Sequence, residues 1–144
     1  TATASDEVVK DVKRILHIPR AVILRASFNR PNLYYEVRRK DESTVEKIAE
    51  LALSECLEET GIVYCFSRKE AETVAEQLQS FGVRAQPYHA QMLAEDRRRV
   101  HSGWCNGSVQ VVVATIAFGM GIDKPNVRFV CHYTLSKNLE SYYQ

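Results

Sequence analysis

Apolar residues near the start of the chain recur at the spacing of one helical face. They follow Ser5, a residue type that often caps the start of a helix, and Pro19 comes shortly after the last of them. The apolar positions are Val8, Val9, Val12, Ile15 and Leu16. This pattern predicts a short helix between Ser5 and Pro19.

The next segment is rich in residues that favour strands. Ala21 to Ser27 and Leu33 to Arg38 carry β-branched and aromatic side chains, and Pro31 lies between them. Because proline interrupts a regular strand, the sequence predicts two short strands here rather than one.

A second helical pattern follows a capping box. Ser43 is followed three residues later by Glu46, which is the arrangement in which both side chains bind backbone N–H groups at a helix start. The apolar positions of one face are Val45, Ile48, Ala49, Ala52 and Cys56. We predict a helix that continues to about Glu59.

From Gly61 onward, short apolar runs alternate with helical stretches. The run Ile62 to Phe66 leads directly into a second capping box, Ser67 to Glu70, and Gly82 follows that helix as a termination signal. Further predicted elements are a helix over Glu95 to Cys105 and strands over Val83 to Tyr88, Val109 to Ala114 and Val127 to His132. Continuous apolar strands separated by helices predict an α/β domain, with a mainly parallel central sheet covered by helices on both faces.

Composition changes this picture little. Hydrophobic residues make up 45% of the 144-residue chain and charged residues 26%, which is typical of a globular domain. The formal net charge of +1 is too small to indicate a nucleic-acid partner, so any such partner must be argued from local motifs.

The four cysteines do not have the spacing of a redox pair or a zinc site. Cys65 and Cys131 lie in apolar runs and are expected to be reduced core thiols, which indicates an intracellular compartment. The sequence has neither an apolar run of about 18 residues nor a signal-peptide pattern, so we expect a soluble protein without a membrane partner.

Candidate chemistry lies directly after the predicted strands, because ligands of an open parallel sheet bind beyond the carboxyl ends of its strands. Ser67 and Arg68 follow the first of these strands, His89 follows the second, and the segment Thr115 to Asp123 follows the third. Parallel strands would bring all three turns to one edge.

Each candidate has a plainer alternative. Ser67 can bind a phosphate together with the N–H groups of a helix start, or it can simply cap the helix, and Arg68 can be a solvated surface charge. Gly119 and Gly121 allow close approach to a ligand but are weak evidence alone. Asp123 can accept hydrogen bonds from a ribose or an arginine, or can cap the turn before Pro125.

Several other catalytic schemes are excluded by their missing patterns. No phosphate loop, dinucleotide fingerprint, zinc-protease motif or serine-hydrolase elbow is present, and no metal site is expected. Arg97 to Arg99 and Arg38 to Lys40 can touch a nucleic-acid backbone, although short charge runs are more often solvated surfaces.

Taken as whole strings, these segments resemble the RecQ family of superfamily-two helicases along nearly the entire chain. Gly61 to Arg68 is similar to motif IV, Tyr88 to Ala90 to the family tripeptide, and Val111 to Phe129 to motif V. Shorter similarities are Thr1 to Ala4 with the end of motif III, Phe28 to Asn32 with the start of the second motor domain, and Glu140 to Gln144 with the lead into motif VI. Phe28 to Arg38 is most similar to the short animal and plant members.

The resemblance implies a second RecA-like motor domain over residues 21–144, preceded over residues 1–20 by the end of motif III and a connecting helix. ATP and Mg would be held mainly by the first RecA-like domain of the same parent protein, which is the expected partner beside single-stranded and duplex DNA. Ser67, Arg68 and Thr115 would hold DNA phosphates. Gly119, Gly121 and Asp123 would lie where motif V faces both the nucleotide and the DNA.

Two functions stay open at this point. The first is an ATP-dependent DNA helicase, in which case the 144-residue piece alone should be inactive because the Walker motifs and motif VI are absent from it, and a nuclear location would follow in a eukaryote. The second is a RecA-like module that binds nucleic acid or protein without motor activity. An unrelated nucleotide-binding domain would need a phosphate loop, which the sequence lacks.

Overall fold

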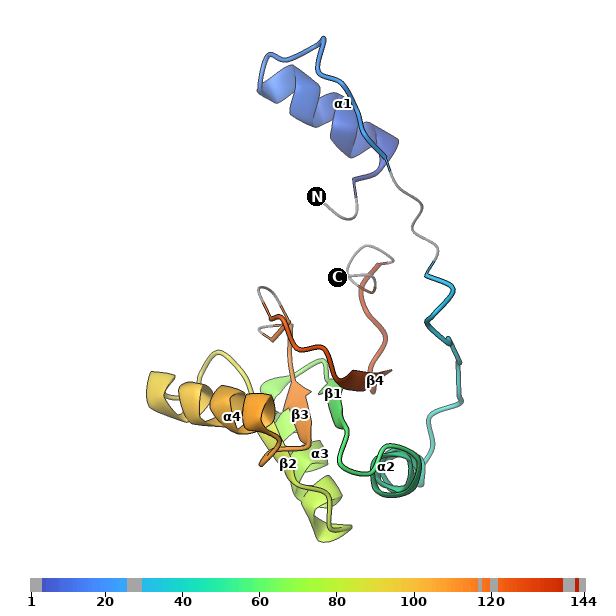
Figure 1. Cartoon of the computed structure of the whole chain (residues 1–144), viewed down its shortest axis with the longest axis vertical. Coiled ribbons are helices and arrows are strands. Elements are labelled where there is room, and N and C mark those ends of the chain that lie inside the picture. The colour runs from blue at the N-terminus through green and yellow to red at the C-terminus, as the bar shows by residue number, and fades with distance from the viewer. Residues whose placement is uncertain (1–3, 26–29, 117, 120–121, 139–141, 143–144) are drawn as a thin grey trace. The chain divides into compact units, whose positions relative to one another are not determined.

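The computed structural model describes residues 4–25, 30–116, 118–119, 122–138 and 142 (Figure 1). These residues form two compact units, one containing the described residues through Arg39 and the other spanning Lys40–Tyr142. The domain boundary expected between residues 20 and 21 stays a prediction. Two of the quoted similarities, with motif III and with the lead into motif VI, fall mostly outside the described residues.

The first unit contains helix α1, Asp6–Ile15, as its one regular element among the described residues. The Ser5 hydroxyl accepts a hydrogen bond from the Val8 N–H at 3.4 Å, and acidic side chains occupy the first turn while Lys13 and Arg14 occupy the last. These charges complement the helix dipole. The predicted helix is confirmed.

The two strands predicted after α1 are wrong for the residues that the structure describes. Residues 21–25 and 33–38 have no strand assignment, and side chains such as Leu24 and Val37 are more than nine-tenths exposed. β-propensity reflects packing on a pleated, half-buried surface more than an intrinsic backbone preference. Strand-forming residues without a neighbouring strand therefore form no strand in the described part of this segment.

The second unit is built on a four-stranded sheet in the order β2-β3-β1-β4, in which every pairing is parallel (Figure 1). The strands are β1 (Thr60–Tyr64), β2 (Ala85–Tyr88), β3 (Val111–Ala114) and β4 (Val127–His132). Tyr64 is in register with Ala114 on one side and with His132 on the other, and Tyr88 is in register with Ala114. The last residues of all four strands therefore lie in one row.

Helices cover both faces of this sheet. Alternate strand residues such as Val63 and Val113 pack with α2 (Thr44–Glu50) and α3 (Arg68–Ser80), in a core that includes Leu78. The intervening residues, such as Ile62 and Val112, pack with α4 (Ala94–Asn106), whose Trp104 is fully buried. The predicted α/β class with a mainly parallel sheet and two helical layers is confirmed.

The helix expected to run to Glu59 is shorter and changes its winding. α2 ends at Glu50 and continues as a π-helix, η1 (Leu51–Glu55). Ser43 makes no side-chain cap, and the Asp41 carboxylate instead accepts from the Ser43 N–H at 3.0 Å. A tertiary contact is made within this π-helix: the Gln110 side-chain amide donates to the Ala52 carbonyl at 2.7 Å. Among the described residues, no helix is long and apolar enough to cross a membrane.

Candidate functional site

Four turns meet at the carboxyl edge of the sheet. Phe66 and Ser67 follow β1, His89 follows β2, Thr115 follows β3, and Tyr133 and Thr134 follow β4. Because the strands are parallel and their last residues are in register, the three turns expected from the sequence lie on one edge. The turn after β4 joins them and was not anticipated.

Ser67 caps α3 as the sequence predicted. Its hydroxyl accepts a hydrogen bond from the Glu70 N–H at 3.1 Å, and its backbone is extended. A helix start also presents backbone N–H groups that have no partner inside the helix, together with the positive end of the helix dipole. The cap and an anion site are thus compatible at this position.

Arg68 is exposed at the first position of α3. Among the described residues no ion pair to its guanidinium is found, in contrast to Arg84, which lies 3.4 Å from the Glu58 carboxylate. A positive charge at a helix start interacts unfavourably with the helix dipole, so dipole stabilisation does not account for Arg68. Its charge therefore adds to the positive potential around Ser67.

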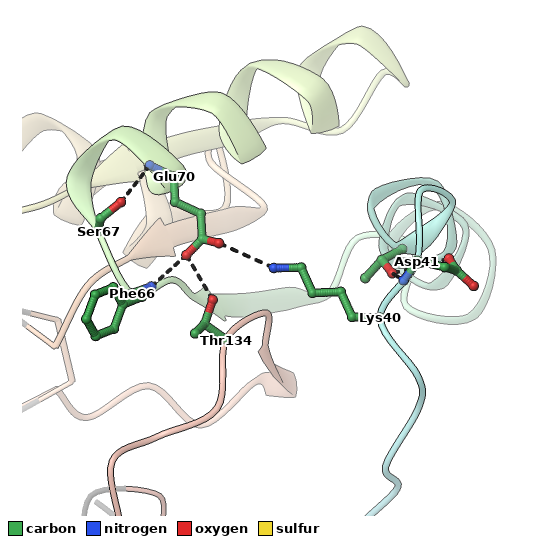
Figure 2. Close-up of polar contacts among 7 residues, drawn as sticks. Lys40, Asp41, Phe66, Ser67, Glu70 and Thr134 are labelled. Carbon is green, nitrogen blue, oxygen red and sulfur yellow. Dashed lines mark hydrogen bonds and ion pairs between the residues drawn. The ribbon is translucent and has the colours of Figure 1, made fainter.

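The Glu70 carboxylate contacts three other groups at this edge (Figure 2). Its Oε2 accepts from the Phe66 N–H at 2.8 Å and from the Thr134 hydroxyl at 2.9 Å, while Oε1 lies 3.3 Å from Lys40 Nζ. Partial burial acts to raise the pKa of Glu70, but these hydrogen bonds and the Lys40 charge outweigh it and lower the pKa below its ordinary value. The group is therefore a carboxylate at neutral pH.

The turn after β3 is fixed by Tyr64. The Tyr64 hydroxyl donates to the Phe118 carbonyl at 2.9 Å, and the Thr115 N–H donates to the Tyr88 carbonyl at 3.3 Å. Gly119 has a φ of +131°, and a Cβ on it would lie 2.7 Å from the Tyr64 hydroxyl oxygen. The glycine is needed here for close approach, as its type suggested, and the neighbour is a tyrosine of the chain itself.

Two further candidates in this segment are less constrained. Gly121 lies outside the described residues. Asp123 is exposed and makes no hydrogen bond to a described residue, whereas the adjacent Lys124 donates from Nζ to the Cys105 carbonyl at the end of α4, at 3.0 Å. A cation at a helix C-terminus complements the dipole, so Lys124 anchors this part of the loop.

His89 is the buried member of the edge, with 6% of its surface exposed. Its Nε2 lies 3.1 Å from the Glu72 carboxylate on α3, and its buried Nδ1 has no hydrogen-bond partner among the described residues. This contact ties the turn after β2 to the same helix that Ser67 caps.

Sequence reasoning missed the residues that join the turns to one another. Thr134 was not singled out in the sequence, Tyr64 was noticed only within the motif IV string, Lys40 only within a basic run, and Glu70 only as part of a capping box. The available signal was the register, since the last residues of paired parallel strands must be neighbours. Reading that register requires knowing the strand order, which the local pattern does not give.

The described residues hold no group of three or more His, Cys, Asp or Glu side chains that could bind a metal ion. The sequence likewise contains no phosphate loop. The residues present therefore do not by themselves fit a complete ATP and Mg site, and no chemical step can be assigned through those groups on this chain.

Residues 43–144 match the family model of the helicase conserved C-terminal domain. The chain belongs to this family. Over its whole length it is 54% identical to ATP-dependent DNA helicase Q1 of Rattus norvegicus and 51% identical to ATP-dependent DNA helicase Q-like 2 of Arabidopsis thaliana. It is 46% identical to the ATP-dependent helicase SGS1 of Saccharomyces cerevisiae. The expected membership of the RecQ family is confirmed.

The chain spans 24% of the length of the rat relative, 21% of the Arabidopsis relative and 10% of the yeast relative. Among solved structures it is similar to S. cerevisiae Dbp5 bound to RNA and ADP BeF3, with a TM-score of 0.76 and 22% identity over 99% of this chain and 39% of that one. It is also similar to the Mycobacterium smegmatis helicase Lhr bound to ssDNA and AMP-PNP, with a TM-score of 0.55 and 27% identity over 61% of this chain and 12% of that one. The RecA-like fold of a helicase C-terminal domain is thereby confirmed.

Proposed function

We propose that this helicase C-terminal domain is the second motor domain of a RecQ-type ATP-dependent DNA helicase, and that it binds single-stranded DNA through its phosphates. Its whole-length relatives are named as ATP-dependent DNA helicases. The Lhr structure, a neighbour at 27% identity, holds single-stranded DNA and a nucleotide. In a eukaryotic cell the parent protein would act in the nucleus.

The observation that carries the proposal is the register of β1 with β3. Tyr64 pairs with Ala114, so the helix start at Ser67 and Arg68 and the turn at Thr115 follow neighbouring strands at the same edge. Hydroxyl groups, backbone N–H groups at a helix start and an arginine are the usual ligands of nucleic-acid phosphates. We assign Ser67, Arg68 and Thr115 to the DNA backbone on this basis.

The same edge would face the nucleotide through the segment that contains Gly119, Gly121 and Asp123. In this proposal residues 21–144 form the motor domain, and the first RecA-like domain of the parent protein holds ATP and Mg. Phosphoryl transfer depends mostly on positioning and charge stabilisation. In this proposal the chain positions its loop against a cleft, and the first RecA-like domain supplies the phosphate-binding groups of that cleft.

ATP turnover by the full-length protein, measured with and without single-stranded DNA, tests the proposal against the alternative of a non-catalytic binding module. Turnover that rises with added DNA, and that falls in the Arg68→Ala variant at subsaturating DNA, is the expected result. DNA binding without any DNA-stimulated turnover would favour the binding module.

A further inference from the structure

The Glu70 side chain joins three segments that are far apart in the sequence (Figure 2). One carboxylate receives the Phe66 N–H of the turn after β1, the Thr134 hydroxyl of the turn after β4, and the Lys40 ammonium group at the beginning of the second unit. The side chain is 26% exposed, so these contacts are partly shielded from water. Hydrogen bonds to an ionised group are stronger than those between neutral groups.

These contacts fix the backbone immediately before Ser67. Glu70 accepts from Phe66, while its own N–H donates to the Ser67 hydroxyl at 3.1 Å, so the side chains of residues 67 and 70 hold the turn reciprocally. The Ser67 hydroxyl accepts from the Glu70 N–H. The direction of this hydroxyl therefore depends on how α3 is placed relative to Phe66. The orientation of the helix start is therefore set by one carboxylate.

Lys40 offsets the negative charge that Glu70 brings to this edge. Its Nζ lies 3.3 Å from the carboxylate and 3.5 Å from the ring centroid of Tyr133, the residue before Thr134. The ammonium group is held by a carboxylate and an aromatic face at once. A carboxylate near a phosphate site would otherwise repel the ligand.

We propose that Glu70 is a positioning residue for phosphate binding: it orients the Ser67–Arg68 helix start by bonding Phe66 to the turn after β4. The inference rests on the proposed function, because the ligand that benefits is the DNA backbone. It predicts an unusual direction for the change in DNA affinity. Removal of a negative charge near a DNA site normally strengthens binding, whereas removal of this carboxylate weakens it.

The experiment measures the affinity of the full-length protein for a single-stranded oligonucleotide at several salt concentrations. Glu70→Ala is expected to weaken binding about five- to tenfold, which is the scale of one ordinary net hydrogen bond. Glu70→Gln keeps one acceptor oxygen, whose two lone pairs can receive both the Phe66 N–H and the Thr134 hydroxyl, and should retain most of the affinity. Glu76→Ala, which removes the same charge from an exposed position of the same helix, should bind as tightly as the unmodified protein or slightly more tightly.

A double-mutant cycle separates positioning from a general loss of structure. Arg68→Ala should cost less affinity in the Glu70→Ala background than alone, because a misplaced helix start has already lost part of the arginine contact. If Glu70→Ala does not fold, Thr134→Val gives the same information by removing one partner, with a smaller loss in the same direction. Equal or tighter DNA binding by folded Glu70→Ala, or strictly additive effects with Arg68→Ala, would overturn the inference.

The failure of the proposed function has a different signature. If Arg68→Ala and Thr115→Ala both leave DNA affinity unchanged, the carboxyl edge of the sheet does not bind phosphates. The positioning role of Glu70 is then wrong as well. If those variants weaken binding and Glu70→Ala does not, the proposed function stands and only the positioning role is wrong.

Discussion

The hydroxyl oxygen of Tyr64 lies only 2.7 Å from the place where a side chain on Gly119 would begin. The same hydroxyl donates to the carbonyl of Phe118, the residue before that glycine, at 2.9 Å. One tyrosine therefore both holds the turn after β3 and leaves no room for a side chain at residue 119. Tyr64 is on β1, so this contact links the motif IV strand to the motif V loop.

Gly119→Ala is expected to destabilise the chain by about 1 to 3 kcal/mol, because an L-residue is strained at a φ of +131° and its Cβ meets the tyrosine oxygen. Urea unfolding measures the loss. In a Tyr64→Phe background the cost of Gly119→Ala should shrink, since the oxygen atom is gone, although the backbone strain stays.

Tyr88→Phe is the matched control for this pair. Its ring also contacts Phe118, at 4.8 Å between centroids, but the described residues give its hydroxyl no hydrogen bond. The cost of Gly119→Ala should be unchanged in the Tyr88→Phe background. An equal cost in all three backgrounds would contradict the steric role of Tyr64.

Arg68→Ala and Thr115→Ala in the full-length protein should weaken single-stranded DNA binding to a similar extent for different base sequences, because phosphate contacts carry no base information. For Arg68→Ala, the slope of log affinity against log salt should fall by about one unit, because one fewer counterion is released. Arg98→Ala, which removes an exposed arginine of α4, serves as the control and should leave both quantities unchanged if that charge is only solvated. A changed base preference with an unchanged slope would show that the role given to Arg68 is wrong.

Asp123→Ala distinguishes a local cap from a group that couples nucleotide and DNA. As part of the coupling loop, the residue should be needed for DNA-stimulated ATP turnover, which would fall at least tenfold, or about 1.4 kcal/mol in barrier, at a nearly unchanged melting temperature. We expect this loss of turnover, because the exposed Asp123 carboxylate makes no hydrogen bond to a described residue.

A simple cap would behave differently. Asp123→Ala would then lose about 0.5 to 2 kcal/mol of stability with normal turnover per folded molecule, and Asp123→Asn would restore the stability because asparagine caps equally well. Turnover at saturating DNA equal to that of the unmodified protein, together with a clearly lowered melting point, would show that Asp123 is only a local cap.

The cysteines should differ sharply in reactivity toward a disulfide reagent at pH 8. Burial raises the pKa of the Cys65 thiol to about 12, so almost none of it is thiolate at that pH, and its side chain is also inaccessible. Cys105 is exposed on α4 and should be modified first. Mass spectrometry of the partly modified native protein identifies the sites, and unfolding in urea should release Cys65. Rapid modification of native Cys65 would show that the strand end opens readily.

Local patterns in the sequence determined much of this domain. The alternation of apolar runs and helical stretches from Gly61 onward predicted β1, α3, β2, α4, β3 and β4 in order, and the Ser67 cap and the glycine after α3 were readable because each depends on neighbours within four residues. The motif strings added the RecQ family. The α/β class followed because strands buried on both faces must be continuously apolar.

Only the tertiary structure decided the features that depend on distant partners. The strand-like residues between 21 and 38 form no strand in the described part of that segment, since a strand exists only where another strand accepts its hydrogen bonds. The helix after Ser43 passes into a π-helix that is bonded to Gln110 across the fold. Likewise, the contacts of Glu70 with Thr134 and of Tyr64 with Phe118 span 64 and 54 residues. Such pairs follow from the order β2-β3-β1-β4, which is set by the packing of the whole sheet and by no local pattern.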